Sequence, residues 1–410
     1  MNKDNKNLKL LSGICLYLQI FTLRHSAIYF DQINNIMIKA GILGGGQLGR
    51  MLLQVAANFP VETYVMENDE NCPSAHLCNH FIKGDITNFA DVYHFGKSVD
   101  VLTIEIENVN IAALELLEKE GLPVYPNSNS LKIIKNKISQ KQFYKENGIA
   151  TSDFLITENL EELKNNSHFL PAVHKLASGG YDGKGVKIIN EIVEIENGFN
   201  HPSVLEKKVN IKKELSVIVA VDKNKNHCVF PVIEMIFDNK LNLLNYQIAP
   251  AQTDDQINNV AISLALKTIL LLNSPGIFAV ELFVDNDNNV SVNETAPRVH
   301  NSGHHTIEAN FCSQFEMLWR IILNYPLGNP KSIMPSLLIN VIGSDGFSGT
   351  PVYEGLADVL EIENVYCHIY GKTETRPGRK MGHINILAQN VSELKDKAGR
   401  IKNLLKVKSK

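Results

Sequence analysis

The stretch Gly179-Gly180-Tyr181-Asp182-Gly183-Lys184-Gly185 lies shortly after Lys175. Four of these seven residues are glycine, so backbone N–H groups are exposed that larger side chains would cover. Successive N–H groups form a concave site for anions, and the lysines beside them suit a polyphosphate. Taken alone, the run is also compatible with a glycine hairpin that binds nothing. Other motifs in the chain favour the phosphate loop.

Two glutamates further along the chain form a predicted cation site. Asp287-Asn288 is a natural two-residue turn between two predicted strands, residues 278–284 and 289–293. This turn places Glu281 opposite Glu294, with their Cβ atoms about 5 Å apart. Two carboxylates at that distance repel each other unless a cation lies between them. Mg²⁺ binds through one or two carboxylates together with substrate phosphates, and Asn293 can add an oxygen ligand.

A calcium loop of the EF-hand type is excluded at the same place. Asp285, Asp287 and Asn289 imitate the start of such a loop. Val290 and Ala296, however, stand where the loop requires glycine and glutamate.

A second glycine motif lies near the start of the chain. Gly44, Gly46 and Gly49 form G-x-G-x-x-G between a predicted strand and a predicted helix, and Glu67 follows further on. This order is typical of a dinucleotide-binding turn. The same turn can hold any phosphate at a helix N-terminus, or nothing at all. A dehydrogenase would leave the other glycine loop and the paired glutamates without a role.

Two donor-rich segments complete the motifs. The segment Ala296-Pro297-Arg298-Val299-His300-Asn301-Ser302-Gly303-His304-His305 directly follows the predicted metal strand, so we expect it to contact substrate. Lys372 and the run Arg376-Pro377-Gly378-Arg379-Lys380 form a cationic cluster. The planar fork of arginine suits phosphate oxygens, although such a cluster can also be a solvated loop.

The composition is that of a globular protein of two or three domains. The chain has 410 residues, of which 44% are hydrophobic and 20% charged, and its net charge is −4. Neither half is strongly basic, which argues against a general nucleic-acid binder. Six cysteines are scattered without a C-x-x-C pair, so neither a zinc site nor a disulfide framework is indicated, and we expect a reducing cytoplasm.

The first 36 residues differ from the rest. Three lysines precede an apolar run at residues 10–23, the order of a secretory signal. No A-x-A cleavage site follows, and the run is short for a membrane span. Met37 then opens a strand that needs nothing upstream, so we expect the folded protein to begin there.

Hydrophobic periodicity predicts an α/β unit followed by a mixed α+β unit. The expected strands are 38–43, 63–66, 101–106, a short strand around Lys175, 185–189, 203–207 and 214–221. The expected helices are 111–119, 131–147, 257–273 and 314–323. Residues 336–410 are expected to form a small sheet of their own with a closing helix and a frayed, lysine-rich tail.

Four motifs in this order, GILGGGQLGR (41–50), GGYDGKG (179–185), ELFV…VNETAPRVHNSGHHT (281–306) and RPGRKMGH (376–383), closely resemble the 5-(carboxyamino)imidazole ribonucleotide synthetase family. The resemblance runs from about Met37 to the C-terminus. It implies a multidomain α/β and α+β enzyme: an extension at 1–36, a Rossmann-like preATP-grasp domain at 37–136, an ATP-grasp domain at 137–330 and a small C-terminal domain at 331–410. It also implies a cytoplasmic homodimer.

The resemblance implies a reaction as well. In this family ATP phosphorylates bicarbonate to carboxyphosphate, and the amine of 5-aminoimidazole ribonucleotide captures the carboxyl group, with Mg²⁺ or Mn²⁺ as cofactor. No nucleic acid and no membrane is expected as a partner. Positioning and charge neutralisation are what phosphoryl transfer requires.

The resemblance assigns residues to four groups. Asp182, as the base for the amine, Arg298 and Lys175 are the expected catalytic residues, and Glu281 and Glu294 are the expected metal ligands. The expected ATP contacts are Lys137, Lys175, Gly180, Tyr181, Asp182, Gly183, Lys184, Gly185, Val186, the adenine hinge Glu206, Lys207, Lys208 and Val209, then Glu214, Asn293 and Glu294. The expected ribonucleotide contacts are Glu107, Tyr181, Asp182, Arg298, His300, Asn301 and Ser302, with Lys372, Arg379 and Lys380 at the 5′-phosphate.

Some positions depart from the family pattern. His174 replaces an aliphatic residue, Leu176 and Ala177 replace polar or basic ones, and Phe237 stands where histidine is typical. None of these changes removes a residue that the chemistry requires, so we expect an active enzyme. Another ATP-grasp ligase acting on a related purine precursor, a dehydrogenase and an inactive ATP-binding scaffold are the alternatives.

Overall fold

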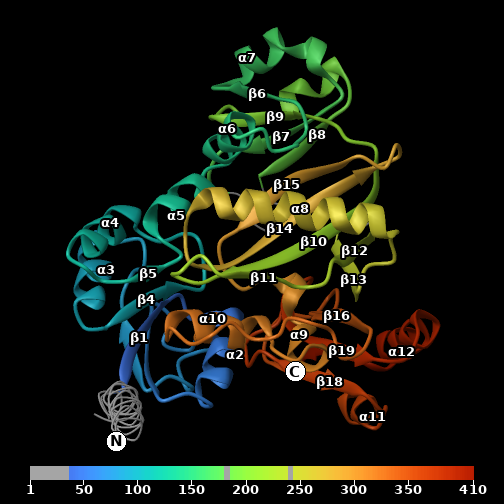
Figure 1. Cartoon of the computed structure of the whole chain (residues 1–410). Helices are drawn as coiled ribbons and strands as arrows, with labels where there is room; N and C mark the ends of the chain where they lie inside the picture. Colours follow the sequence, from blue (N-terminus) through green and yellow to red (C-terminus); the bar gives the residue numbers. More distant parts are fainter. Residues whose placement is uncertain (1–36, 180–184, 239–242) are drawn as a thin grey trace, which may run out of the picture. The chain divides into compact units, whose positions relative to one another are not determined.

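The computed structural model describes residues 37–179, 185–238 and 243–410 (Figure 1). The expectations for the extension at 1–36 and for Gly180, Tyr181, Asp182, Gly183 and Lys184 fall outside these residues. From Lys39 to Lys410 the chain packs as one compact unit. No helix within the described ranges is long and apolar enough to span a membrane.

The first sheet confirms the predicted Rossmann-like unit. Its order is β3-β2-β1-β4-β5, and the pairs β1·β4, β2·β3 and β4·β5 are parallel. The strands are β1 (Ile38–Leu43), β2 (Val61–Glu67), β3 (His80–Lys83), β4 (Val101–Ile104) and β5 (Val124–Tyr125), and the helices are α2 (Gln47–Ala56), α3 (Phe89–Gly96) and α4 (Ile111–Lys119). Strands β3 and β5 were not predicted, because they are too short for a clear periodic pattern.

The prediction of a single helix at 131–147 is wrong. The structure has two helices there, α5 (Ser128–Lys135) and α6 (Lys137–Glu146), separated by Asn136. Asn136 is extended, with φ −110 and ψ 118, and its side-chain oxygen accepts from the backbone N–H groups of Ile138 and Ser139. Asparagine is a strong N-cap, so it begins a new helix inside an otherwise continuous pattern.

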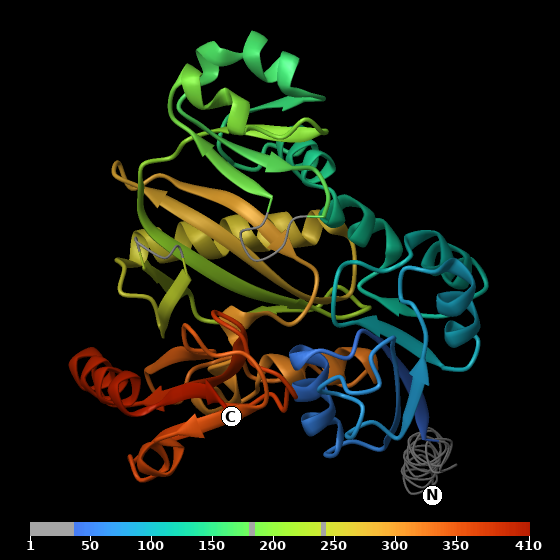
Figure 2. The same ribbon diagram turned by 180° about the vertical axis from the view of Figure 1, so that it is seen from behind.

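The central part of the chain contributes two antiparallel sheets. The four-stranded sheet has the order β6-β9-β7-β8, and α7 (Leu160–Asn165) packs beside β6 (Figure 2). Its strands are β6 (Phe154–Thr157), β7 (Ala172–Leu176), β8 (Val186–Ile189) and β9 (Ser203–Lys207). Short 3₁₀ turns η1 (Ser167–Phe169) and η2 (Ile192–Asn197) connect these elements.

The larger sheet has nine strands and the order β15-β14-β10-β12-β13-β16-β19-β18, with β11 beside β10. Helix α8 (Asp255–Leu272) packs on β10, β14 and β15 (Figure 1). The strands are β10 (Ile211–Val221), β11 (His227–Val229), β12 (Ile233–Asp238), β13 (Leu243–Ala249), β14 (Gly276–Asp285), β15 (Val290–Ala296), β16 (Ser336–Ile342), β18 (Val365–Ile369) and β19 (Lys380–Leu387).

This sheet corrects the expectation of a separate C-terminal sheet. Strand β16 pairs with β13 through Gln247 and Leu338, so the C-terminal strands extend the central sheet. The tail is not frayed either, because β20 (Lys406–Ser409) pairs with β17 (Pro351–Glu354). The predicted closing helix is α12 (Val391–Leu404), and α11 (Leu356–Leu360) is a short additional helix.

Helices α9 (Thr306–Ala309) and α10 (Gln314–Ile322) follow β15. Trp319 on α10 is fully buried and donates from its indole N–H to the carbonyl oxygen of Leu52, at 2.7 Å. This contact joins α10 to α2 and so connects the first sheet to the region that follows β15.

Candidate active site

Two carboxylates of the protein occupy the glycine turn before α2. The backbone N–H of Leu48 donates to Glu105 Oε1 at 3.0 Å, and that of Gly45 donates to Glu67 Oε2 at 3.1 Å. A Cβ atom on Gly46 would lie only 2.5 Å from Glu105 Oε1. The helix N-terminus, which in a dinucleotide-binding turn faces pyrophosphate, is therefore filled by Glu105. The dinucleotide interpretation of this motif is wrong.

Glu105 is buried, and its protonation reflects two opposed effects. Burial raises the pKa of Glu105 to about 7, although the positive charge of Arg298 and the N–H groups of the turn act in the opposite direction. The charge of Arg298 therefore favours the ionised form of Glu105.

The paired glutamates of β14 and β15 lie opposite each other, as predicted. The route to this pairing differs from the expectation. The turn is longer than the predicted two residues, because Asp285 N–H donates to Asn289 O. Asn288 within it has a φ of 65°. As a result, Val284 pairs with Val290. A β-bulge then shifts the register and brings Glu281 opposite Glu294.

The extra residue of the bulge is Asn293, and its side chain meets a lysine. Lys175 Nζ donates to Asn293 Oδ1 at 2.9 Å and forms an ion pair with Glu206 Oε1 at 3.0 Å. Lys137 Nζ lies 2.6 Å from Glu294 Oε2, and its backbone N–H donates to Ala177 O. The structure therefore brings both predicted phosphate lysines to the predicted metal strand.

The two glutamates have opposite electrostatic surroundings. The charge of Lys137 lowers the pKa of Glu294, whereas burial and the neighbouring charge of Glu294 raise the pKa of Glu281. Burial also raises the pKa of Glu214, on β10, to about 7, and its negative charge adds to the rise at Glu281. Lys137 and Lys175 thus face three carboxylates, those of Glu214, Glu281 and Glu294, and a further cation would relieve the repulsion.

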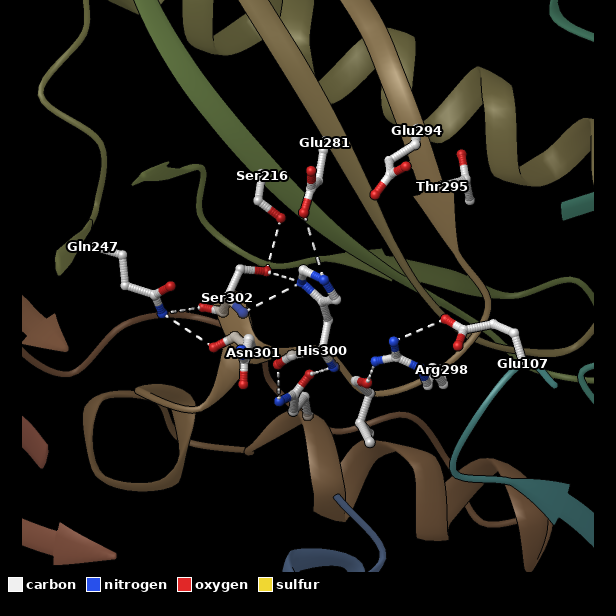
Figure 3. Close-up of polar contacts among 12 residues, drawn as sticks. Glu107, Ser216, Gln247, Glu281, Glu294, Thr295, Arg298, His300, Asn301 and Ser302 are labelled. Carbon is white, nitrogen blue, oxygen red and sulfur yellow. Dashed lines mark hydrogen bonds and ion pairs between the residues drawn. The ribbon is translucent and has the colours of Figure 1, made fainter. Parts of the chain in front are cut away.

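The turn after β15 lies beside Glu281. His300 Nε2 is 3.5 Å from Glu281 Oε1, and Ser302 Oγ bonds both His300 Nδ1 and Ser216 Oγ (Figure 3). Gln247 Nε2 donates to the carbonyl oxygen of Ser302 at 2.7 Å. The His300-Asn301-Ser302 turn is thereby fixed to three strands, β10, β13 and β14.

Arg298 forms an ion pair with the first domain. Its Nη2 atom lies 2.8 Å from Glu107 Oε1, and a dashed line marks this ion pair in Figure 3. Glu107 and Arg298 were both predicted to contact the ribonucleotide, and the structure places them in direct contact.

Gln47 is a candidate that the sequence analysis missed. Its amide donates to Asn301 Oδ1 at 3.3 Å and accepts from Lys372 Nζ at 3.1 Å. It thus connects helix α2 to the His300-Asn301-Ser302 turn and to Lys372 of the C-terminal cationic cluster. Its place inside GGGQLGR is a usable signal, because a polar side chain directly after a glycine turn lies where ligands approach.

The C-terminal cations are only partly brought together. Lys372 Nζ donates to the carbonyl oxygen of Lys380 at 2.6 Å, which holds these two residues close. Arg379 donates instead to the carbonyl oxygen of Glu374 at 2.7 Å, at an exposed position. Arg379 as a phosphate ligand stays a prediction.

In the expected adenine hinge, the side chains of Lys207 and Lys208 are bonded to neighbouring segments of the protein. Lys207 Nζ donates to Phe169 O and Leu170 O, and Lys208 Nζ donates to Asn190. The backbone N–H groups of Lys207 and Lys208 are also bonded, to Asp153 O and Pro171 O. Adenine contacts here would fall to carbonyl oxygens or to Val209. In the phosphate loop, Gly185 and Val186 are described, and Gly185 O accepts from Leu176 N–H.

The fold and these contacts define the class of the protein, an ATP-grasp ligase. Three family models match along the chain: a ribonucleotide synthetase preATP-grasp domain at residues 37–135, an ATP-grasp domain at 142–315 and a phosphoribosylaminoimidazole carboxylase C-terminal domain at 336–397.

More particularly, the chain belongs to the N5-carboxyaminoimidazole ribonucleotide synthase family. It is 35% identical to the N5-carboxyaminoimidazole ribonucleotide synthase of Brucella melitensis, over 84% of this chain and 94% of that protein. It is 34% identical to the chloroplastic phosphoribosylaminoimidazole carboxylase of Vigna aconitifolia, over 87% of this chain but only 65% of that longer protein. The chain thus spans about two thirds of the carboxylase's length.

Solved structures agree. The N5-carboxyaminoimidazole ribonucleotide synthetase of Thermotoga maritima matches with a TM-score of 0.85 and 35% identity, over 91% of this chain and all of that one. The Aspergillus clavatus synthase in complex with ADP and 5-aminoimidazole ribonucleotide matches with a TM-score of 0.81 and 29% identity, over 90% and 98%.

Proposed function

We propose that this chain carries out the reaction of its family, the ATP-dependent carboxylation of 5-aminoimidazole ribonucleotide to N5-carboxyaminoimidazole ribonucleotide in purine biosynthesis. Bicarbonate takes the γ-phosphoryl group of ATP to give carboxyphosphate and ADP. The exocyclic amine of the ribonucleotide then attacks the carboxyl carbon, phosphate leaves, and the amine proton passes to a base. The reaction is a carbon–nitrogen ligation.

Lys175 and Lys137 bind the phosphates in this proposal. Each lysine approaches the β14·β15 pair, where one contacts Asn293 and the other Glu294. Positive charge held by packed strands stabilises the negative charge that develops on the transferred phosphoryl group. The backbone of the hinge at Glu206 to Val209 is proposed to hold adenine, and Glu214 the ribose.

The donor set of the acid pair fits Mg²⁺. Among the described residues, no cluster of three or more histidine, cysteine, aspartate or glutamate side chains could hold a metal ion alone. Mg²⁺ needs no such cluster, because one or two carboxylates and substrate phosphates suffice. Glu281 and Glu294 would hold the ion, with Asn293 beside them, and the repulsion that raises the pKa of Glu281 is what a cation would remove. The bound ion would neutralise phosphate charge.

The ribonucleotide is proposed to lie between the His300-Asn301-Ser302 turn and the C-terminal lysines, Lys372 and Lys380. Arg298, fixed by Glu107, would hold the carboxyl donor and the imidazole, while Asn301 and Lys372, joined through Gln47, would contact the ribose and the 5′-phosphate. Lys380 lies beside Lys372. The roles of Asp182 as base and of Tyr181 stay predictions, as do the homodimer and the cytoplasmic location.

The contact between His300 and Glu281 carries this proposal. It joins the phosphate side of the site, at β14 and β15, to the turn that holds the proposed ribonucleotide ligands. A carboxylation through carboxyphosphate requires these two sides to be adjacent, since the intermediate is formed on one and consumed on the other.

The test is the release of ADP with Mg-ATP and bicarbonate, measured with and without 5-aminoimidazole ribonucleotide. We expect turnover to depend strongly on the ribonucleotide and to yield its carboxylated product. ATP hydrolysis that is indifferent to the ribonucleotide would assign the chain a different acceptor, and no turnover at all would favour an inactive scaffold.

A further inference from the structure

Helix α6 directs four side chains towards β9 and β15, and one of them is a buried lysine that has no role in the reaction proposed above. Their spacing is i, i+3, i+4 and i+7, which places them on one face of the helix. They are Lys137, Gln140, Lys141 and Tyr144. Lys137 contacts Glu294, while Gln140 and Tyr144 bond Thr295 of β15. Lys141 is the buried lysine without an assigned role, and its exposed fraction is only 2%.

The ammonium group of Lys141 connects the two sheets of the ATP-grasp region. Its Nζ atom donates to Thr151 Oγ1 at 2.6 Å, and Thr151 Oγ1 donates to the carbonyl oxygen of Val292 on β15. The same Nζ atom lies 2.9 Å from Glu206 Oε2 on β9. One buried cation therefore reaches both the strand of the acid pair and the strand of the hinge.

Glu206 is shared between two lysines. Its Oε2 atom receives Lys141 and the hydroxyl of Ser152, at 2.9 and 2.8 Å, whereas Oε1 has Lys175 Nζ at 3.0 Å. Glu206 is 3% exposed, so its charge is desolvated. Burial alone would raise its pKa, but the charges of Lys175 and Lys141 prevail and lower it. Glu206 is thus held as a carboxylate.

This sharing matters for Lys175, which the proposed function assigns to ATP phosphates. A phosphate bound at Lys175 would compete with Glu206 for the charge of the ammonium group, so binding requires the contact with Glu206 to loosen. Without a second cation, that movement would leave a buried carboxylate unpaired, which is strongly unfavourable. With Lys141 in place, Glu206 keeps a partner and Lys175 is released at a lower cost.

We propose that Lys141 is a positioning residue that holds Glu206, so that Lys175 is free to bind the phosphates of ATP. It acts through Glu206 and touches no reacting atom. The inference rests on the proposed function, because it takes Lys175 as a phosphate ligand.

The experiment compares the full chain with Lys141→Met, Lys141→Met/Glu206→Gln and the control Lys145→Met. Lys145 lies one turn further along α6 and is exposed, so the control removes a lysine from the same helix without touching the network. The KM values for ATP and for 5-aminoimidazole ribonucleotide, and kcat, are measured for each, and the Kd for Mg-ADP is measured by calorimetry.

For Lys141→Met we expect KM for ATP to rise at least about tenfold, equivalent to about 1.4 kcal/mol, because Glu206 then retains Lys175. The KM for the ribonucleotide should stay within about twofold of the original value, and so should every constant of Lys145→Met. Adding Glu206→Gln removes the charge that retains Lys175. The double variant should therefore recover most of the affinity for ATP, which a merely structural role of Lys141 would not allow.

An unchanged KM for ATP in Lys141→Met would overturn the inference, and so would a double variant that binds ATP no better than the single one. If Lys141→Met does not fold, Lys141→Gln replaces it in the same comparison, since an amide still donates to Thr151. Failure of the proposed function is distinguishable, because it would show in the unaltered chain as turnover independent of the ribonucleotide.

Discussion

The substitution Gly46→Ala tests whether the glycine turn before α2 exists to admit Glu105. Gly46 has φ −74 and ψ −158, a backbone conformation that alanine adopts freely, so any effect must come from the added methyl group. That Cβ atom would lie 2.5 Å from Glu105 Oε1 and 3.1 Å from Oε2. The carboxylate must therefore move by about half an ångström or more to leave an acceptable contact.

The movement breaks the hydrogen bond from Leu48 N–H to Glu105, which is 3.0 Å long. Hydrogen bonds to charged groups contribute about 1.5 to 3 kcal/mol, and an N-cap interaction about 1 kcal/mol. The helix N-terminus has no solvent to replace the lost acceptor, since Glu105 and Leu48 are both buried. We expect the free energy of unfolding to fall by about 2 kcal/mol.

Urea unfolding at pH 8, where Glu105 is ionised, measures the effect for Gly46→Ala, Glu105→Asp and the double variant. Aspartate is one methylene shorter, so the double variant should lose less stability than the two single changes together. Gly399→Ala, inside α12, is the control: a Cβ atom there meets nothing within 4 Å, so this change should not destabilise the protein and can stabilise it by up to about 1 kcal/mol. A Gly46→Ala protein as stable as the original, or full additivity in the double variant, would refute the reasoning.

Three further predictions concern the site and its surroundings. Glu294→Gln removes the partner of Lys137 and a proposed Mg²⁺ ligand, so the rate of ADP release should fall at least about a hundredfold; unchanged turnover would remove the metal assignment. Arg298→Gln leaves Glu107 without its ion pair, so the KM for the ribonucleotide should rise while the Kd for Mg-ADP stays unchanged. A shift in both constants would contradict a role of Arg298 confined to the ribonucleotide. Burial lowers the pKa of His174 to about 4, below the value of about 6.5 in the unfolded chain. The buried neutral imidazole therefore contributes fully to the free energy of unfolding above about pH 6.5, and this contribution, up to about 3 kcal/mol, is lost as the pH falls towards 4. Urea titrations across this range should show a weaker pH dependence for His174→Gln.

Much of the site could be predicted from the sequence because its chemistry depends on local spacing. Glu281 and Glu294 lie in two alternating strands joined by a short turn, and the structure pairs them. The path to that pairing could not be predicted. A longer turn shifts the register by one residue and the bulge at Asn293 restores it, and the sequence pattern is compatible with either a shorter turn or this pair of compensating shifts.

Contacts between distant segments could not be predicted. Gln47 meets Asn301 and Lys372, and Lys141 meets Glu206, across separations in the chain that no periodic pattern encodes. The break between α5 and α6 is a different failure, since Asn136 carried a recognisable capping signal inside an apparently continuous helix.

The glycine turn shows why a motif has to be judged with the segment that faces it. G-x-G-x-x-G predicts a phosphate only if the helix N-terminus is open, and here the segment after β4 closes it. That segment supplies Glu105 to the turn and, two residues later, Glu107 to Arg298. In the first domain, Glu105 therefore occupies the place of a bound anion, and Glu107 orients Arg298 of the ATP-grasp domain. In the proposed function, phosphate binding then falls to Lys137, Lys175 and the C-terminal lysines. This division of roles predicts that changes at Glu105 affect the ribonucleotide KM through Arg298, while the affinity for ATP stays unchanged.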